Sequence, residues 1–375
     1  MKNKYFIPVF KPSITNKNRL DVLKALYSSE ISGTSNIVKE FEESIAKKFD
    51  REYAVSVSNG SVALDLAFQF KEFKEQDEII LPSFTIISCL SSILRTNAKP
   101  IFCDVDKDTW CMTLEEVKKN VTEKTKAILV VHTYGLTAEI KKIEKFCEEK
   151  NILLIEDSAE AHGILIDNKA CGSFGLMSTM SFYANKHITA GEGGAVLTDD
   201  KKVYDKLLQM RNLDFTSKKR FQHDNFYWNY RMGGLQAALG KSQINNINKT
   251  IKYKISQGNY YQELLKDQED FLQLPLKEAN GVPNNYWVFG ILLKKENIRE
   301  KVIEELDKKG IETRPFFWPL HLQNALLRGK NSNNKLIVSE NLGKNGFYIP
   351  MGKHVSKKTQ KFITTNLISF VNKYS

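Results

Sequence analysis

Short apolar segments alternate with amphipathic stretches between residues 51 and 197. The apolar segments are typical of buried strands, and the stretches between them, such as residues 62–73 and 139–150, place apolar side chains at helical spacing. The predicted strands cover residues 53–57, 78–81, 100–105, 127–131, 152–155, 179–182 and 195–198. Strands that alternate with helices predict a mainly parallel sheet with helices on both faces.

The pattern changes after about residue 239. The predicted elements there are a helix over residues 243–266, a strand over 286–293, a helix over 298–309, a short extended run over 312–317 and a helix over 359–374. The Asn-rich stretch at residues 330–335 predicts a surface loop. We therefore expect a large domain over residues 1–245 and a smaller C-terminal α/β domain over residues 246–375.

Composition narrows the class of protein. Hydrophobic residues make up 42% and charged residues 26% of the 375-residue chain, as in folded globular proteins. The formal net charge of +11 favours an anionic partner, such as a phosphorylated substrate, a nucleic acid or a membrane surface. Because the lysines are scattered and no apolar run is long enough to cross a bilayer, we expect neither nucleic acid nor a membrane as partner.

The five cysteines form no Cys-x-x-Cys pair, which argues against a disulfide framework, a zinc site and an iron–sulfur cluster. We therefore expect no metal. The N-terminal stretch is too weakly apolar for a signal peptide. Together these features predict a protein of the reducing cytoplasm.

Three short motifs carry candidate chemistry. In VSNGSVAL (residues 57–64), a strand passes through Gly60 and Ser61 into a helix, and a helix N-terminus of this kind favours a phosphate. An equally good interpretation is that Ser61 simply caps the helix. In LLIEDSAE (residues 153–160), Asp157 and Glu160 follow an apolar strand, where ligands bind in open α/β sheets, although either carboxylate would also suit a helix cap.

The third motif places Lys186 between a strand and the glycine-rich turn at residues 191–194. A lysine with a depressed pKa can form a Schiff base with an aldehyde, whereas a structural role is the usual one for a single lysine. Taken together, the motifs offer a phosphate anchor, an acid partner for a ring nitrogen and an amine. Pyridoxal 5'-phosphate (PLP) needs these three groups.

These motifs resemble those of the DegT/DnrJ/EryC1 family of sugar aminotransferases. The resemblance runs from residue 7 to the last predicted helix and is carried by SNGSVAL, EDSAEAHG, SFYANKHITAGEGG, NYRM and GIETRPFFWPLH. It implies a PLP-dependent transferase of fold type I, similar to aspartate aminotransferase, with a mixed and mostly parallel sheet in the large domain. The small domain would close over the substrate.

The resemblance also implies roles for individual residues. Lys186 would form the Schiff base and move protons, and Asp157 would pair with the pyridinium nitrogen. The other expected cofactor contacts are Glu160 near the ring, Gly60, Ser61 and Ser181 at the phosphate, Ile86 where many relatives stack an aromatic ring, and Asn229 at the phosphate of the partner subunit's cofactor. A site shared in this way would make a homodimer obligatory.

Two segments, residues 314–321 and 218–220, and the separate Arg231 are candidates for the substrate. In the first segment, the expected contacts Arg314, Phe316, Phe317 and His321 offer a cation, an aromatic wall and an imidazole to a sugar nucleotide. For residues 314–321, a packed strand end is an equally good interpretation. Lys218-Lys219-Arg220 would attract a diphosphate, although such a trio is more often a solvated loop.

The implied reaction has two halves. L-glutamate would convert PLP to pyridoxamine 5'-phosphate and leave as 2-oxoglutarate, and the amine would pass to C4 of a nucleotide-linked 4-keto-6-deoxy sugar. The resemblance, especially in TRPFFWPLH, favours GDP-4-keto-6-deoxymannose as the substrate, and it implies a product for surface polysaccharide such as O-antigen. The alternatives are a 3-dehydratase, in which histidine replaces the Schiff-base lysine (here His187 follows Lys186), and a 3-keto sugar aminotransferase for dTDP- or UDP-linked substrates. A non-enzymatic PLP-binding regulator is disfavoured, because the chain begins directly with the enzyme-like segment.

Overall fold

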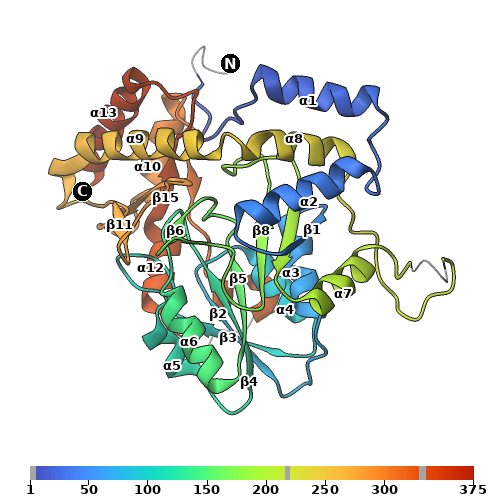
Figure 1. Cartoon of the computed structure of the whole chain (residues 1–375). Helices are drawn as coiled ribbons and strands as arrows, with labels where there is room; N and C mark the ends of the chain where they lie inside the picture. The colour runs from blue at the N-terminus through green and yellow to red at the C-terminus, as the bar shows by residue number, and fades with distance from the viewer. Residues whose placement is uncertain (1–5, 216–219, 329–334) are drawn as a thin grey trace.

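A seven-stranded sheet forms the centre of the computed structural model, which describes residues 6–215, 220–328 and 335–375 (Figure 1). Its strand order is β1-β9-β8-β5-β4-β2-β3. Strand β9 runs antiparallel to both of its neighbours, and the other neighbouring pairs are parallel. The mainly parallel sheet predicted from the sequence is therefore confirmed. The strands are β1 (Tyr53–Val57), β2 (Glu78–Pro82), β3 (Lys99–Cys103), β4 (Thr125–Val131), β5 (Leu153–Asp157), β8 (Met177–Ser181) and β9 (Gly194–Thr198).

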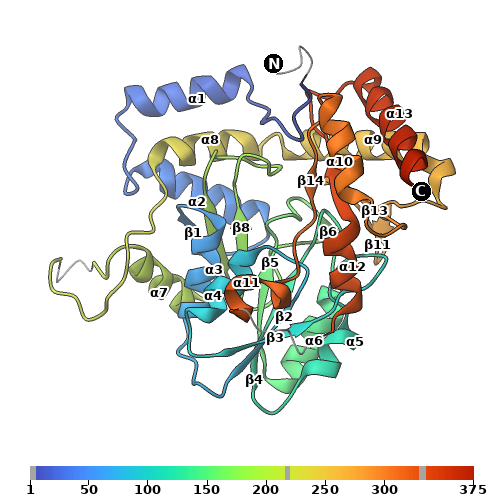
Figure 2. The ribbon, with the colours of Figure 1, turned by 180° about the vertical axis from the view of Figure 1, so that it is seen from behind.

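Helices cover both faces of this sheet (Figures 1 and 2). Ile79 and Leu81 of β2 belong to an apolar cluster with α3, α4 and α7, whereas Ile80 packs with α5 and α6 on the other face. This alternation is the period of two that a strand buried on both sides must have. The covering helices are α2 (Asn36–Lys48), α3 (Gly60–Gln69), α4 (Ile87–Leu94), α5 (Leu114–Asn120), α6 (Ile140–Lys150), α7 (Lys201–Arg211) and α8 (Gly234–Ile244).

A second, antiparallel sheet lies in the C-terminal part of the chain, with the strand order β10-β13-β15-β14. It has its own apolar core, to which α9, α10 and α13 contribute. These elements are β10 (Leu272–Gln273), β13 (Phe289–Leu293), β14 (Arg314–Pro315), β15 (Gly346–Ile349), α9 (Ile247–Leu265), α10 (Arg299–Lys308) and α13 (Lys357–Tyr374). Shorter elements are the hairpins β6 (Leu165–Ile166) with β7 (Lys169–Ala170) and β11 (Glu278–Ala279) with β12 (Val282–Pro283), the 3-10 helices η1 (Lys266–Gln268) and η2 (Leu320–Leu322), and the helices α11 (Asn324–Leu327) and α12 (Ile337–Asn345).

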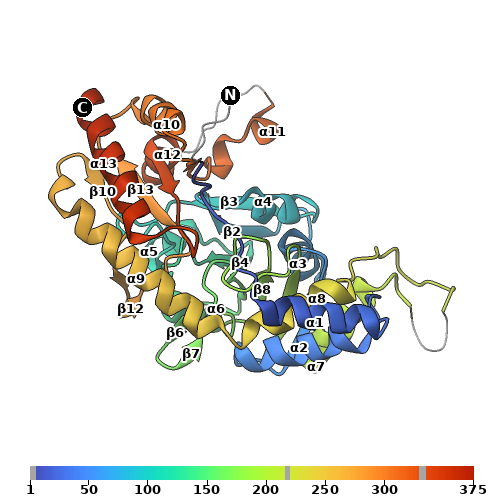
Figure 3. The ribbon, with the colours of Figure 1, turned by 90° about the horizontal axis from the view of Figure 1, so that it is seen from above.

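The N-terminal segment is tied to the C-terminal sheet rather than to the central one. The backbone N–H of Ile7 donates to the carbonyl of Gly310 at 2.7 Å, and Ile7 forms a bridge with Ile311. The carbonyl of Val9 accepts a hydrogen bond from the N–H of Met351 at 3.1 Å. The chain then enters α1 (Asn16–Tyr27), which lies alongside α8 (Figure 3).

Some element boundaries differ from the predictions. The helix predicted over residues 243–266 is divided between α8 and α9, because Asn245 and Asn246 separate them and asparagine is a poor residue for a helix interior. Strand β13 starts later than predicted, because Tyr286 has a left-handed φ of 48°. Residues 218–219 and 330–334 of the predicted loops lie outside the described part of the chain. The division into domains at residue 245 stays a prediction.

Among the described residues, no helix has both the length and the apolar character needed to cross a membrane.

Candidate active site

The candidate residues meet at one edge of the central sheet. Strands β5 and β8 are parallel neighbours with Asp157 opposite Thr179, so their C-terminal ends lie together. Strand β9 then places Gly194 opposite both Val57 of β1 and Ser181 of β8. The turn before α3 and the end of β8 therefore lie side by side, at the edge where ligands bind in open α/β sheets.

The N-terminus of α3 packs closely on the end of β8. A Cβ on Gly60 would lie 2.8 Å from Cβ of Ser181, so only glycine lets the helix begin so near this strand. The helix is capped by Asn59, whose Oδ1 accepts a hydrogen bond from the N–H three residues further on at 3.0 Å, and not by Ser61. Ser61 instead lies in the first turn, with its Oγ 2.6 Å from Oγ of Ser88. Backbone N–H groups in a first turn have no partner within their helix, so this position is suited to a phosphate.

Asp157 is a buried carboxylate that has no ion pair within the described residues. Its side chain is at the end of β5, where the whole residue is 3% exposed. Oδ1 accepts the N–H of Ala159 at 3.0 Å, and Oδ2 lies 3.6 Å from Sγ of Cys89, which donates to it. Burial raises the pKa of Asp157, although these donors and the charge of Lys186 oppose the rise. A cationic nitrogen bound at Oδ2 would compensate the buried charge.

Lys186 and Glu160 form a buried ion pair. Nζ of Lys186 lies 3.4 Å from Oε1 of Glu160, and both side chains are 9% exposed. Oε2 of Glu160 accepts the backbone N–H of Tyr134 at 2.9 Å. Burial raises the pKa of Glu160 to about 7, although the charge of Lys186 lowers it. Nζ of Lys186 also lies 3.8 Å from the ring centroid of Trp287, in cation–π contact.

This arrangement fits PLP. The close approach of Gly60 to Ser181 leaves a helix start free for a phosphate, and Asp157 provides a buried acid without a cationic partner among the described residues. Beside Asp157, the buried Oγ1 of Thr179 has no hydrogen-bond partner within the described part of the chain. Lys186 provides the primary amine on the same edge of the sheet.

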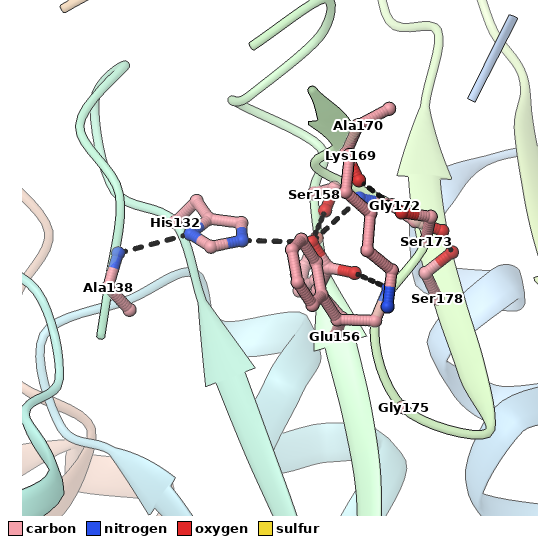
Figure 4. Close-up of polar contacts among 12 residues, drawn as sticks. His132, Ala138, Glu156, Ser158, Lys169, Ala170, Gly172, Ser173, Gly175 and Ser178 are labelled. Atoms are coloured by element: carbon pink, nitrogen blue, oxygen red, sulfur yellow. Dashed lines mark hydrogen bonds and ion pairs between the residues drawn. The ribbon is translucent and has the colours of Figure 1, made fainter. Parts of the chain in front are cut away.

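Glu156, the residue before Asp157, is fully buried and accepts four hydrogen bonds (Figure 4). We call Glu156 and its four donors the hub; the sequence interpretation did not identify it. Oε1 of Glu156 accepts hydrogen bonds from Nε2 of His132 at 2.9 Å, Oγ of Ser158 at 2.7 Å and the N–H of Gly172 at 2.6 Å. Its Oε2 accepts the N–H of Phe174 at 2.9 Å. Burial raises its pKa, but these hydrogen bonds, above all that from His132, outweigh burial and leave the pKa below its usual value. The hub fixes the end of β5 and therefore the position of Asp157.

Two residues of the hub, His132 and Glu156, form a possible metal-binding group with Cys171, and the candidate ligand atoms lie within 4.8 Å of one another. Nδ1 of His132 accepts the backbone N–H of Ala138 at 3.1 Å, so Nε2 carries the proton that is donated to Glu156. Both ring nitrogens and both carboxylate oxygens are thus already engaged by protein donors and acceptors. We interpret the group as a hydrogen-bond network.

The segment containing Asn229 and Arg231 passes beside the turn before α3, since the carbonyl of Tyr230 accepts the N–H of Ser58 at 2.9 Å. Arg231 is partly buried and its guanidinium donates to Asn212, whereas Asn229 is exposed. Ile86 is 41% exposed, immediately before α4. Asn229 and Ile86 are thus both exposed in the single chain. The predicted contact of Asn229 with the partner subunit's cofactor and that of Ile86 with the cofactor ring stay predictions.

The segment at residues 314–321 is mostly packed inside the protein. Phe316 is buried against Tyr134, with 4.9 Å between ring centroids, and His321 is buried with Nδ1 2.6 Å from Oγ of Ser83. The partly buried Phe317 donates its N–H to Oη of Tyr134 at 3.2 Å. The exposed Arg314 pairs with its neighbour Glu312, so the segment offers packing rather than a free binding surface, and its substrate contacts stay predictions.

A cavity of about 80 Å³ lies next to Lys186. Its walls come from segments far apart in the sequence: residues 9–13, residues 184–187, helices α8 and α9, and residues 348–353. Asp157, Ser61 and Ser181 do not line it. Among the candidate catalytic and cofactor residues, Lys186 is therefore the one that lines this cavity.

Comparison with solved structures defines the class of protein. The fold matches an aminotransferase from Psychrobacter cryohalolentis with a TM-score of 0.90 and 25% identity, covering 99% of this chain and 100% of the other. It also matches an E. coli GDP-4-keto-6-deoxy-D-mannose-3-dehydratase with bound hydrated PLP, with a TM-score of 0.88 and 25% identity, covering 97% of this chain and 100% of that one. The protein is thus a PLP-dependent enzyme with the fold-type I aminotransferase architecture.

Sequence comparison narrows this class. Residues 12–368 match the DegT/DnrJ/EryC1/StrS aminotransferase family. A GDP-perosamine synthase from Escherichia coli O157:H7 is 36% identical over 365 residues, which cover 97% of this chain and 98% of that protein. The chain belongs to the DegT/DnrJ/EryC1/StrS aminotransferase family and is a PLP-dependent sugar aminotransferase. The family resemblance seen in the sequence is confirmed, and the dehydratase alternative is not favoured.

Proposed function

We propose that this enzyme transfers the amino group of L-glutamate to the C4 keto group of GDP-4-keto-6-deoxymannose, forming GDP-perosamine. The observation that carries the proposal is the 36% identity, over nearly the whole chain, to a protein named GDP-perosamine synthase. The retained amine of Lys186, paired with Glu160 at 3.4 Å, supports transamination over dehydration. A role in the synthesis of an O-antigen or another surface polysaccharide is part of the same proposal.

In this proposal the edge of the central sheet holds the cofactor. The phosphate is bound by the first turn of α3 at Gly60 and Ser61 and by Ser181, and Asp157 binds the ring nitrogen. When bound, PLP supplies an electron sink for the pair left at the substrate carbon when its proton is removed. With PLP bound, the two half-reactions would use its PLP and pyridoxamine 5'-phosphate forms in turn, and Ile86 would lie against one face of its ring.

The acid–base work falls to Lys186. Its Nζ removes a proton from carbon in one direction and returns one in the other, as a general base and then a general acid. Glu160 lies within reach of this amine, and its pKa of about 7 lets it take part in the exchange near neutral pH. Nζ is held against the ring of Trp287, which limits its approach to one side.

The active site is completed, in this proposal, by a second copy of the chain. Asn229 is exposed and is therefore free to reach a partner subunit's cofactor phosphate. Large apolar side chains are exposed on the same segment: Phe226 at 104% and Trp228 at 65%. A homodimer interface would remove them from water. The five cysteines are free and buried, which supports our placement of the enzyme in the reducing cytoplasm.

The test begins with the visible absorption spectrum of the purified enzyme. A band from bound PLP that bleaches on addition of L-glutamate alone would support the cofactor and the amino donor. GDP-4-keto-6-deoxymannose is then added to the bleached enzyme, and the product is identified by mass and by NMR of the sugar C4. dTDP- and UDP-linked 4-keto sugars serve as matched controls for the nucleotide.

Return of the band only with the GDP-linked substrate, together with a 4-amino product, would support the whole proposal. A product that has lost the 3-hydroxyl would instead indicate dehydratase chemistry. An amine at C3, or activity confined to a dTDP or UDP sugar, would keep the aminotransferase and reject its proposed substrate.

A further inference from the structure

The cavity beside Lys186 has lysines in its walls and no carboxylate. Four lysines contribute to the lining: Lys11 before α1, Lys186 after β8, Lys254 on α9 and Lys353 after β15. None of the described residues that form the walls is aspartate or glutamate. Lys186 has its partner Glu160, which lies outside the cavity walls. The positive charge of the other lysines is therefore not compensated inside the cavity.

Lys254 is partly buried in the wall of this cavity. Its Nζ donates to the carbonyl of Trp287 at 2.9 Å, and it forms no ion pair with any residue in the described part of the chain. Burial lowers the pKa of Lys254 to about 7. A buried cation without a counter-charge is unfavourable, and an anion bound beside it would restore its charged form.

The other polar residues of the wall carry no negative charge. The imidazole of His187 lines the cavity, with its Nε2 3.3 Å from the carbonyl oxygen of Asn285. Burial lowers the pKa of His187, and the charge of Lys254 lowers it further, so the ring is neutral and its Nδ1, which has no partner among the described residues, is an acceptor. Gln243, Thr250 and Tyr253 also line the wall. The lysine ammonium groups are therefore the charged donors that an oxyanion would find here, with no carboxylate to repel it.

Trp287 connects this wall to the chemistry. Its carbonyl oxygen accepts the hydrogen bond from Lys254, and its ring is 3.8 Å from Nζ of Lys186. Its indole N–H donates to the carbonyl of Asn185 at 3.2 Å, so its position is fixed from both sides. An anion held by Lys254 would thus lie close to the reactive amine while remaining apart from the proposed phosphate cradle at Gly60 and Ser61.

We propose that Lys254, with Lys11 and Lys353, forms an anion subsite that binds phosphate or carboxylate oxygens of a substrate next to Lys186. The inference rests on the proposed function, because the two candidate anions belong to the substrates of that reaction. One is the diphosphate of the nucleotide sugar, and the other is a carboxylate of the amino donor. Both are oxyanions that a lysine can bind as a point charge.

The test compares Lys254→Met and Lys254→Arg with a control, Lys252→Met, on the exposed side of the same helix. The ligands are inorganic pyrophosphate and L-glutamate, titrated into PLP-loaded enzyme by calorimetry and by the loss of the cofactor band, respectively. Loss of one charge-assisted contact predicts roughly 10-fold to 100-fold weaker binding in Lys254→Met. Lys254→Arg should recover most of the lost affinity, and Lys252→Met should bind both ligands like the parent enzyme.

Weaker pyrophosphate binding with unchanged glutamate bleaching would assign the subsite to the diphosphate, and the reverse would assign it to a carboxylate. Unchanged affinity for both ligands, in a Lys254→Met protein that keeps its cofactor spectrum and melting temperature, would overturn the proposal. So would equal weakening in Lys252→Met. If instead the parent enzyme binds pyrophosphate but aminates no GDP-linked sugar, the proposed substrate is wrong while the subsite stands.

Discussion

Replacing Glu156 by glutamine tests whether the buried hub behind Asp157 stabilises the protein as its geometry indicates. The substitution keeps the size of the side chain and removes its charge. Oε1 accepts three hydrogen bonds, so the amide oxygen would take this place. The new amide nitrogen would then face the N–H of Phe174, which now donates to Oε2 at 2.9 Å.

The magnitude follows from two losses. A buried donor left facing another donor costs about 1–3 kcal/mol, and hydrogen bonds to a neutral acceptor are weaker than those to a charged one. We therefore expect Glu156→Gln to lower the free energy of unfolding by about 3 kcal/mol at neutral pH. The hydrogen bonds to Glu156, above all that from His132, outweigh burial and lower the pKa of this carboxylate in the folded protein. The ionised Glu156 therefore stabilises the fold fully above its usual pKa of 4.5, and this stabilisation is lost as the pH falls through the lower pKa of the folded state.

The measurement is urea unfolding of the parent and variant enzymes at pH 7.5 and again near pH 4, at one fixed protein concentration. The exposed Glu149→Gln, on α6, is the matched control and should change stability by less than about 0.5 kcal/mol. The difference between Glu156→Gln and the parent should narrow at the lower pH. A variant as stable as the parent at pH 7.5 would refute the argument, as would a difference that grows at low pH.

Three other substitutions test the site directly. Lys186→Ala should abolish transamination in a single-turnover assay while PLP still binds without a covalent bond, and normal turnover in this variant would exclude Lys186 as the essential amine. Asp157→Asn should retain the cofactor but reduce kcat by orders of magnitude, since a neutral amide cannot hold the proton on the ring nitrogen; an unchanged kcat would point to another acid. Gly60→Ala should weaken PLP binding, because its Cβ would lie 2.8 Å from that of Ser181 and such overpacking costs about 1–3 kcal/mol. Equilibrium dialysis of PLP measures this, and unchanged affinity would show that α3 can shift without cost.

The central sheet was predictable because each buried strand leaves a local signal. In β4, Ala127, Leu129 and Val131 face one apolar cluster while Ile128 and Val130 face the other, so the strand is continuously apolar. The signal is less exact for β14: the extended run predicted over residues 312–317 contains it, but the strand itself has two residues, because its extent depends on pairing with β15. The division between α8 and α9 was missed because Gln243 and the residues after it suit a helix on either side of the two asparagines.

The candidate site was predictable only as far as it lies in contiguous motifs. Asp157, Glu160 and Lys186 follow predicted strands, so parallel neighbours bring them to one edge. Lys254 gives no such signal, since its partners in the cavity wall come from both ends of the chain and only folding places them together. Phe316 shows another limit: the sequence left open whether this aromatic side chain faces a sugar or packs at a strand end, and only the fold shows it buried against Tyr134.

The attachment of residues 7–9 to the C-terminal sheet has a consequence for the order of events during synthesis. One part of the cavity wall, at residues 9–13, leaves the ribosome before every strand of the central sheet, and another part, at residues 348–353, leaves it after all of them. Val9 receives its hydrogen bond from Met351 only after all the residues between them have been made. The central sheet has all of its strands by Thr198, so a nascent chain can assemble the edge that carries Lys186 long before the pocket beside it closes. A growing chain therefore cannot complete the pocket beside Lys186 until residues 348–353 have been made.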